Sequence, residues 1–159
     1  MTKQIIHIEI ASIDEAAIIL EVQKEAFSGQ AKIYNNFDLP PLSQTLESIK
    51  REFSKKIFLK ACVENQIIAS VRFDMTKEAV TIHRLVVKPE YQNNGIGLDL
   101  LNKVEKLSPN TDTFKLFTGS RSVRNIHLYE KAGYKTIKTE FTDFGVEILH
   151  MEKNCAVIF

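Results

Sequence analysis

Short segments of alternating or continuous apolar residues along the chain predict seven β-strands. We expect strands at residues 5–10, 57–64, 67–74, 80–87, 114–118 and 134–141, with a last one that ends near Met151. Alternation with a period of two is typical of strands that bury one face. A tight turn at Asn65-Gln66 is expected to join the second and third strands into a hairpin, and Phe144-Gly145 forms the turn before the last strand.

Apolar residues that recur three to four positions apart predict four helices. The first follows Ser12 as its N-cap, and we expect Gly29 to end it. The others are predicted at residues 43–54, 95–107 and 123–132, and residues 30–42 are expected to form a loop stiffened by Pro40-Pro41. The resulting order β-α-α-β-β-β-α-β-α-β-β predicts an α/β (α+β) fold. The chain shows no linker or repeat, so we expect residues 1–159 to form a single domain.

Composition and charge exclude several classes of function. The 159 residues include 21 Lys and Arg against 20 Asp and Glu, which does not suggest a nucleic-acid surface. No apolar run approaches the length of a membrane span, and the first residues do not resemble a secretory signal, so a cytoplasmic protein is expected. Cys62, read as a buried strand residue, and Cys155 lack metal-ligand spacing with the four histidines, so we expect no metal.

The turn between the fourth strand and the third helix carries the clearest chemical signal. It reads Gln92-Asn93-Asn94-Gly95-Ile96-Gly97. Such a turn can direct several backbone N–H groups at one point, and the first amides of the following helix have no intrahelical acceptor. Because the helix dipole is positive at that end, the turn favours an anion, and a pyrophosphate in particular.

Three phosphate-binding patterns can be compared with this turn. A Walker A loop requires Lys and then Ser or Thr after its second glycine, where this chain has Leu98 and Asp99. A dinucleotide fingerprint requires a third glycine at the position of Leu100. The third pattern, Gln/Arg-x-x-Gly-x-Gly/Ala after Val-x-Pro, is matched by residues 92–97 after residues 87–89. An ordinary strand-to-helix turn, with glycines for tightness, is the alternative.

At these positions the sequence resembles the GNAT acetyltransferase superfamily, which uses acetyl-CoA as co-substrate. The resemblance implies the GNAT fold, with a mixed central sheet of about seven strands that is splayed between the fourth and fifth strands. It also implies that the pantetheine arm pairs with strand backbone at Leu85, Val86 and Val87, and that the backbone N–H of Val86 or Val87 faces the thioester oxygen. The implied cofactor-binding residues of the turn are Gln92, Asn93, Asn94, Gly95, Ile96 and Gly97.

A second string, residues 125–134, resembles the other GNAT signature, Asn-x-x-Leu-Tyr-Glu-Lys-x-Gly-Tyr. Its Asn125 and Tyr129 are four residues apart and share one helix face. The resemblance implies that Asn125 binds the cofactor and that Tyr129 is the general acid that protonates the leaving thiolate. A phenol pKa of about 10 suits that role. The alternatives are that Tyr129 is a packed aromatic and that Asn125 caps its helix, a position for which Ser122 competes.

The general base is not evident in the sequence. Many family members use a glutamate on the strand before the glycine turn, but residues 81–85 read Thr-Ile-His-Arg-Leu and contain no carboxylate. His83 is the candidate, because its ordinary pKa near 6.5 suits a base at neutral pH. Regular alternation would place Thr81, His83 and Leu85 on one face of the sheet. A structural histidine is the other interpretation, with Glu147 or a chain of waters as the base.

The acceptor site is expected between the first two helices, with contributions from Phe27, Tyr34, Phe37 and Asp38. Asp38 could attract a cationic amine, although a solvated loop acid is the alternative. The apolar tail at residues 156–159 could pack onto the last strand or onto a second subunit, so both a monomer and a homodimer remain open.

The sequence therefore predicts an acetyl-CoA-dependent N-acetyltransferase that acts on a primary amine of a small molecule or peptide, by direct attack in a ternary complex. The missing strand glutamate motivates an alternative, a non-catalytic acyl-CoA-binding sensor or partner domain. A nucleotide hydrolase is disfavoured because the Walker lysine is absent. The pattern indicates the donor but neither the acceptor nor the length of the acyl group.

Overall fold

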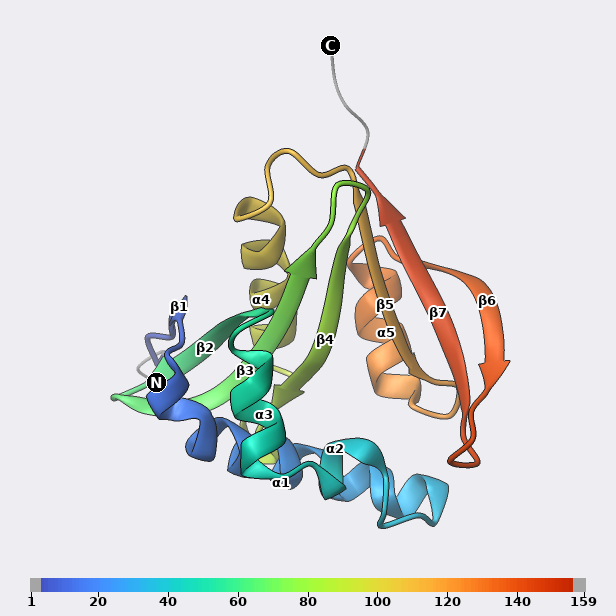
Figure 1. The fold of residues 1–159 in the computed structure, drawn as a ribbon, viewed down its shortest axis with the longest axis horizontal. Coiled ribbons are helices and arrows are strands. Elements are labelled where there is room, and N and C mark those ends of the chain that lie inside the picture. Colours follow the sequence, from blue (N-terminus) through green and yellow to red (C-terminus); the bar gives the residue numbers. More distant parts are fainter. Residues whose placement is uncertain (1–3, 156–159) are drawn as a thin grey trace.

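The computed structural model describes residues 4–155, which form a seven-stranded mixed sheet covered by helices (Figure 1). The strand order is β1-β2-β3-β4-β5-β7-β6, and within these residues β4 and β5 are the one parallel pair. The strands are β1 (His7–Ile10), β2 (Ile57–Val63), β3 (Gln66–Met75), β4 (Val80–Val87), β5 (Thr113–Gly119), β6 (Lys135–Phe141) and β7 (Glu147–Asn154). The predicted α/β fold is confirmed. The tail at residues 156–159 lies outside the described residues, so its packing stays a prediction.

The helices cover both faces of the sheet. They are α1 (Ala16–Tyr34), α2 (Pro40–Ser43), α3 (Leu46–Glu52), α4 (Ile96–Lys106) and α5 (Val123–Lys131), with short 3-10 helices η1 (Ile13–Glu15) and η2 (Pro89–Tyr91). On one face Ile19 of α1 and Ile49 of α3 pack in a cluster with Phe58 and Val86. On the other face Leu100 of α4 belongs to the larger core cluster. Figure 1 shows α3 in front of the sheet and α4 and α5 behind it.

The first helix is longer than the sequence predicts. Gly29 lies inside α1, which continues to Tyr34, so the expected end at Gly29 was wrong. A glycine in a helix costs only about 1 kcal/mol relative to alanine, and burial of Ala31 in the next turn offsets that cost. The helix ends where Asn35 adopts a left-handed conformation at φ 49°. The predicted loop is also shorter, because Pro40 begins α2.

Two other boundaries differ by a few residues. The helix predicted at residues 43–54 is α3 in the structure and begins at Leu46 rather than Ser43, because the Thr45 side chain accepts a hydrogen bond from the Ser48 amide at 3.1 Å and so caps the helix there. The β2–β3 hairpin turns at Glu64 and Asn65, whose φ values of 50° and 66° suit a two-residue hairpin turn, so the turn lies one residue earlier than predicted.

A β-bulge interrupts β4. His83 pairs with Arg72 of β3, but the next paired residue, Val86, lies opposite Ser70. The β4 strand therefore carries one residue more than β3 between these two pairs. Within this segment Arg84 adopts a positive φ of 53°, which is unusual for a residue other than glycine.

The bulge shifts the side-chain alternation of β4. Ile82 before the bulge and Leu85 and Val87 beyond it contact the same core cluster. His83 and Leu85 therefore do not share a face as regular alternation requires, and the predicted grouping of Thr81, His83 and Leu85 was wrong. One extra residue changes the phase of a period-two pattern, and the amino-acid sequence does not mark where it is inserted.

A buried arginine connects the front helices to the sheet. Arg72 on β3 is 2% exposed and donates hydrogen bonds to Gln23 of α1 at 3.1 Å and to Gln44 at 2.9 Å. The Glu52 carboxylate of α3 lies 3.1 Å from the guanidinium. Burial lowers the pKa of Arg72 to about 10, although Glu52 opposes that shift. Gln23 in turn donates to the Pro41 carbonyl at 2.8 Å, so one charge holds α1, α2 and α3 in place.

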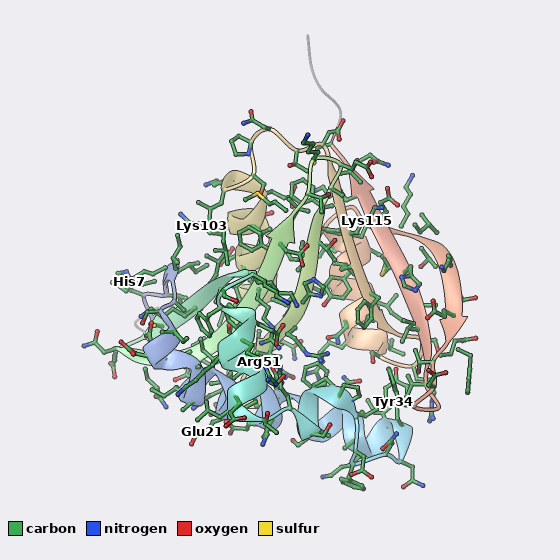
Figure 2. The ribbon with its side chains drawn as sticks, in the orientation of Figure 1. His7, Glu21, Tyr34, Arg51, Lys103 and Lys115 are labelled. Carbon is green, nitrogen blue, oxygen red and sulfur yellow. The ribbon has the colours of Figure 1, made fainter. Side chains whose placement is uncertain are left out.

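We expect the substitution Arg72→Met to lower the free energy of unfolding by about 3 kcal/mol, because it removes the buried cation that pairs with Glu52 and leaves the Gln23 side-chain oxygen without its donor. Chemical denaturation followed by circular dichroism measures this change. The control is Arg51→Gln, which removes a charge from an exposed side chain of α3, the helix that carries Glu52 (Figure 2), and should change stability by at most about 0.5 kcal/mol. Similar effects of both substitutions would contradict the prediction.

Candidate active site

The sheet opens between β4 and β5. These strands pair only at Val80 with Phe114 and Thr81 with Lys115, so the predicted splay is confirmed (Figure 1). Beyond Thr81 the edge of β4 that faces β5 has no strand partner, and its backbone groups remain available to a ligand. A cavity of about 860 Å³ extends from this gap to the glycine turn and is lined in part by residues 85–87.

The glycine turn presents backbone donors to this cavity. Among the described residues, the amides of residues 93–95 have no hydrogen-bond acceptor. Left-handed conformations at Asn93 and Gly95, with φ of 66° and 79°, turn the chain into the N-terminus of α4. A Cβ atom on Gly97 would lie 2.9 Å from a Leu128 methyl carbon, so this glycine lets α4 approach α5 closely.

The electrostatics of the larger cavity favour an anion. Of the residues that line it, Lys32, Arg121, Arg124 and Lys131 are cationic, and no described lining residue is acidic. The Gln92 side chain supports the turn. Its Nε2 atom donates to the Val87 carbonyl at 3.0 Å, and its Oε1 atom accepts a hydrogen bond from the Arg124 guanidinium. Unpaired amides, a helix N-terminus and four cations together suit a phosphate-bearing ligand.

Most of the residues predicted to bind the cofactor lie on this cavity. Its lining includes Leu85, Val86, Val87, Gln92, Asn93, Gly95, Ile96, Gly97 and Asn125. Asn94 is exposed and is not part of the lining, since its side chain donates to the Tyr91 and Gln92 carbonyls and braces the turn instead. Ser122, not Asn125, occupies the N-cap position of α5, which leaves the Asn125 side chain without a capping role.

A smaller cavity of about 310 Å³ adjoins the larger one. The two share Phe27, Gln30, Leu85, Ser122 and Asn125 as lining residues. Tyr129 lines the smaller cavity. Its ring packs edge-on against Tyr134 with 6.2 Å between centroids. Burial raises the pKa of Tyr129 above the ordinary value of 10, so this phenol keeps its proton at neutral pH.

His83 lines the same smaller cavity. Its Nε2 atom lies 3.0 Å from the Asp74 carboxylate. Burial lowers the pKa of His83 below 6.5 and nearby Lys56 lowers it further, while Asp74 acts in the opposite direction. The imidazole is therefore mainly neutral at pH 7 and able to accept a proton. Glu147, the alternative base, has an exposed side chain and lines neither of these two cavities.

The predicted acceptor residues divide into two pairs. Phe27 and Tyr34 line the smaller cavity, and the Tyr34 hydroxyl, at the far end of α1 (Figure 2), lies 2.8 Å from the Ser122 hydroxyl. Phe37 is 67% exposed and Asp38 is also exposed, and neither residue lines this cavity. The α1 extension beyond Gly29 explains this division, because it carries Tyr34 toward the sheet and leaves residues 37–38 in the following turn.

The smaller cavity also has lining residues that the sequence did not indicate. They include Glu52, Lys56, Arg84, Phe117, Gly119 and Phe144. Gly119 has a clear structural reason, since a Cβ atom there would lie 1.9 Å from the Tyr34 hydroxyl oxygen. Phe117 could have been suspected from the alternation in β5, in which it faces away from buried Leu116 and Thr118. No local signal marks Arg84, because its placement depends on the bulge.

The described residues contain no cluster of three or more His, Cys, Asp or Glu side chains that could hold a metal ion. Over the same part of the chain, every helix is too short or too polar to cross a membrane. Both cysteines, Cys62 and Cys155, are free thiols. Cys62 lies on a strand as predicted, but on β2 it is only partly buried where a buried residue was expected.

Known proteins resemble the chain over most of its length. Spermidine N(1)-acetyltransferase of Thermoplasma acidophilum is 25% identical, and the match covers 89% of this chain and 96% of that protein. The UPF0157 protein YqkA of Bacillus subtilis is 26% identical over 83% of this chain, but the chain covers only 39% of that relative.

Solved structures share the fold. The PaiA N-acetyltransferase from T. acidophilum, in complex with coenzyme A, superposes with a TM-score of 0.71 at 26% identity, covering 94% of this chain and 99% of that one. The ribosomal-protein-S18-alanine N-acetyltransferase from Escherichia coli gives a TM-score of 0.76 at 14% identity over 98% and 97% of the two chains, a likeness of fold alone.

Most of the chain matches one protein family. Residues 21–155 match the family described as the acetyltransferase (GNAT) domain. This match spans both glycine-turn and tyrosine-helix motifs, and it covers well over half of the sequence. The chain therefore belongs to the GNAT family of acetyltransferases.

Proposed function

We propose that the protein, as a single domain, transfers an acetyl group from acetyl-CoA to a primary amine of a small molecule, by direct attack within a ternary complex. The observation that carries this proposal is the junction of two cavities. The larger one is cationic and lined by unpaired amides, and the smaller one holds a neutral histidine and a protonated tyrosine. The relative crystallised with coenzyme A supports this donor.

The larger cavity suits the CoA portion of the donor. The turn amides and Arg124 would bind the pyrophosphate, since charged hydrogen bonds at a helix N-terminus favour phosphate groups. Backbone groups of Leu85 and Val87 on the unpaired edge of β4 would bind the pantetheine amides as an added strand. This arrangement would direct the thioester toward the smaller cavity, past Asn125, which lines both cavities.

The smaller cavity suits the chemistry of transfer. His83 would take a proton from the attacking amine while the new C–N bond forms, and Asp74 would hold the imidazole in orientation. A backbone N–H of Val86 or Val87 would stabilise the negative charge on the carbonyl oxygen. As the C–S bond breaks, Tyr129 would donate its proton to the departing sulfur. The raised pKa of Tyr129 keeps that proton in place until the charge develops.

The acceptor is a small amine in this proposal. The curated relative that acts on spermidine makes a polyamine the first compound to test. A cavity of about 310 Å³ admits a small molecule, and side chains of Phe27 and Tyr34 supply an aromatic wall.

Acetyl-CoA should raise the melting temperature of the protein, because it binds the folded state only. We expect Arg124→Gln to weaken acetyl-CoA binding about tenfold, since it removes a charge that both lines the cavity and supports Gln92. Isothermal titration calorimetry measures the affinity. The control is Lys115→Gln on β5 (Figure 2), whose exposed side chain lies outside this cavity, and it should leave the affinity unchanged. Absence of binding at millimolar acetyl-CoA would refute the proposal.

The substitution Tyr129→Phe should lower kcat by about 100-fold or more while acetyl-CoA affinity stays within about twofold, because it removes the proton donor and keeps the ring. Thiol release in an acceptor-amine assay gives kcat, and calorimetry gives the affinity. Unchanged turnover would show that another group protonates the thiolate. Tight acetyl-CoA binding by the wild-type protein without turnover on any amine would favour the sensor alternative.

The pH dependence of kcat/KM should report His83. Because burial lowers its pKa, we expect log(kcat/KM) to rise more steeply at low pH and to rise less steeply above an apparent pKa below 6.5, at which half of the base is neutral. His83→Gln should remove this change of slope. Asp74→Asn should move it to lower pH, because the carboxylate raises the pKa of the imidazole. A profile of His83→Gln with the wild-type shape would contradict the assignment of the base.

A further inference from the structure

We propose that the acceptor amine carries a carboxylate and that Arg84 binds this group, so that the natural substrate is an amino acid rather than a polyamine. The inference rests on the proposed function, because it concerns the acceptor side of the same site. It is carried by a guanidinium on the wall of the smaller cavity that has no partner within the described part of the chain.

Arg84 and Arg72 each have a buried Nε atom without a hydrogen-bond partner, but the partners of their terminal guanidinium nitrogens differ. The Arg72 guanidinium is bound by two glutamine side chains and by Glu52. The Arg84 Nε is shielded from solvent and lacks a hydrogen-bond partner, and no described carboxylate lies within ion-pair distance of this residue. Burial lowers the pKa of Arg84, and Glu52 only partly opposes this effect. A partly buried cation without a partner is costly, and an incoming anion would relieve that cost.

The β4 bulge places Arg84 next to His83, the proposed base. Four of the five residues other than glycine with positive φ occupy turns, whereas Arg84, at φ 53°, lies inside a strand at the bulge. A strained conformation within a strand persists only where the surrounding structure enforces it. The extra residue brings Arg84 and His83 to one cavity although they are adjacent in sequence. A ligand whose amine meets His83 and whose anion meets Arg84 therefore needs the two groups close together, as in an α-amino acid.

The charge balance of the smaller cavity disfavours a polycation. Among the described residues that line this cavity, Glu52 is the acidic one. Its carboxylate is already bound by Lys56 at 2.7 Å and by Arg72 at 3.1 Å. Asp74 nearby is engaged by His83. Because Lys56 and Arg72 offset the charge of Glu52 and Asp74 does not line this cavity, Arg84 leaves an excess of positive charge on the cavity wall that would repel a polyamine and attract a carboxylate.

Pairs of acceptors that differ only in the carboxylate test this proposal. Suitable pairs are lysine and cadaverine, phenylalanine and phenethylamine, and leucine and isopentylamine, with spermidine and phosphoethanolamine as further probes. Thiol release gives kcat and KM for each compound. We expect each amino acid to exceed its matched amine at least about tenfold in kcat/KM, mainly through a lower KM. Equal rates within the pairs, or fastest turnover of spermidine, would overturn the proposal. Preference for phosphoethanolamine would replace the carboxylate by a phosphate and overturn it likewise.

Variants assign the effect to Arg84. In Arg84→Gln the preference within each pair should fall close to unity, whereas Arg84→Lys should restore part of it. The control Arg51→Gln removes an exposed charge from α3 and should keep the full preference. Retention of the preference in Arg84→Gln would show that another group binds the carboxylate. Circular dichroism and acetyl-CoA affinity check that each variant is folded.

A binding measurement separates this inference from the proposed function. The same pairs are titrated into the protein with CoA bound, and the change in melting temperature is recorded. If no amine is acetylated, the proposed function fails. Stabilisation by the amino acids in the wild-type protein but not in Arg84→Gln would then still support the carboxylate site. Absence of stabilisation by every amino acid, together with absence of turnover, would overturn the inference as well.

Discussion

The end of pairing between β4 and β5 is the constraint on which the site depends. Parallel pairing stops after Thr81, so the rest of β4 has an edge whose backbone groups face a gap instead of a strand. The same divergence leaves room for the larger cavity, and the turn at the end of β4 directs the N-terminus of α4 toward it. One interruption in the sheet thus supplies the space, the unpaired hydrogen-bonding groups and the position of the anion-binding turn.

The second half of the site depends on how the front helices are fixed. Arg72 ties Gln23, Gln44 and Glu52 together, and Glu52 lies on the wall of the smaller cavity. Because Glu52 is occupied by this network, its charge is not available to a substrate. The buried ion pair therefore sets the electrostatics of the acceptor cavity in addition to holding the helices, which leaves Arg84 as the charge that a substrate can meet.

Local patterns in the sequence predicted the fold well, and the failures have physical causes. The strand at residues 80–87 and the helix that follows the glycine turn depend on short-range periodicity, and both are observed. Gly29 was expected to end a helix, but burial of the following turn outweighed its intrinsic preference. The bulge at Arg84 has no sequence signature, so the faces of β4 were misjudged. The placement of His83 beside Asp74 likewise depends on pairing between strands. The residues of the acceptor site are brought together by tertiary structure of this kind. The cofactor motifs are continuous in the sequence, and they can therefore be recognised from the sequence alone.

A crystal structure of the protein with coenzyme A bound tests the central proposal most directly. We expect the pyrophosphate to accept hydrogen bonds from the amides of residues 93–97 and the pantetheine to lie along the free edge of β4. The sulfur should then face the Tyr129 hydroxyl at the junction of the two cavities. Coenzyme A bound at another surface, or with its sulfur remote from both Tyr129 and His83, would contradict the proposed placement of the reaction.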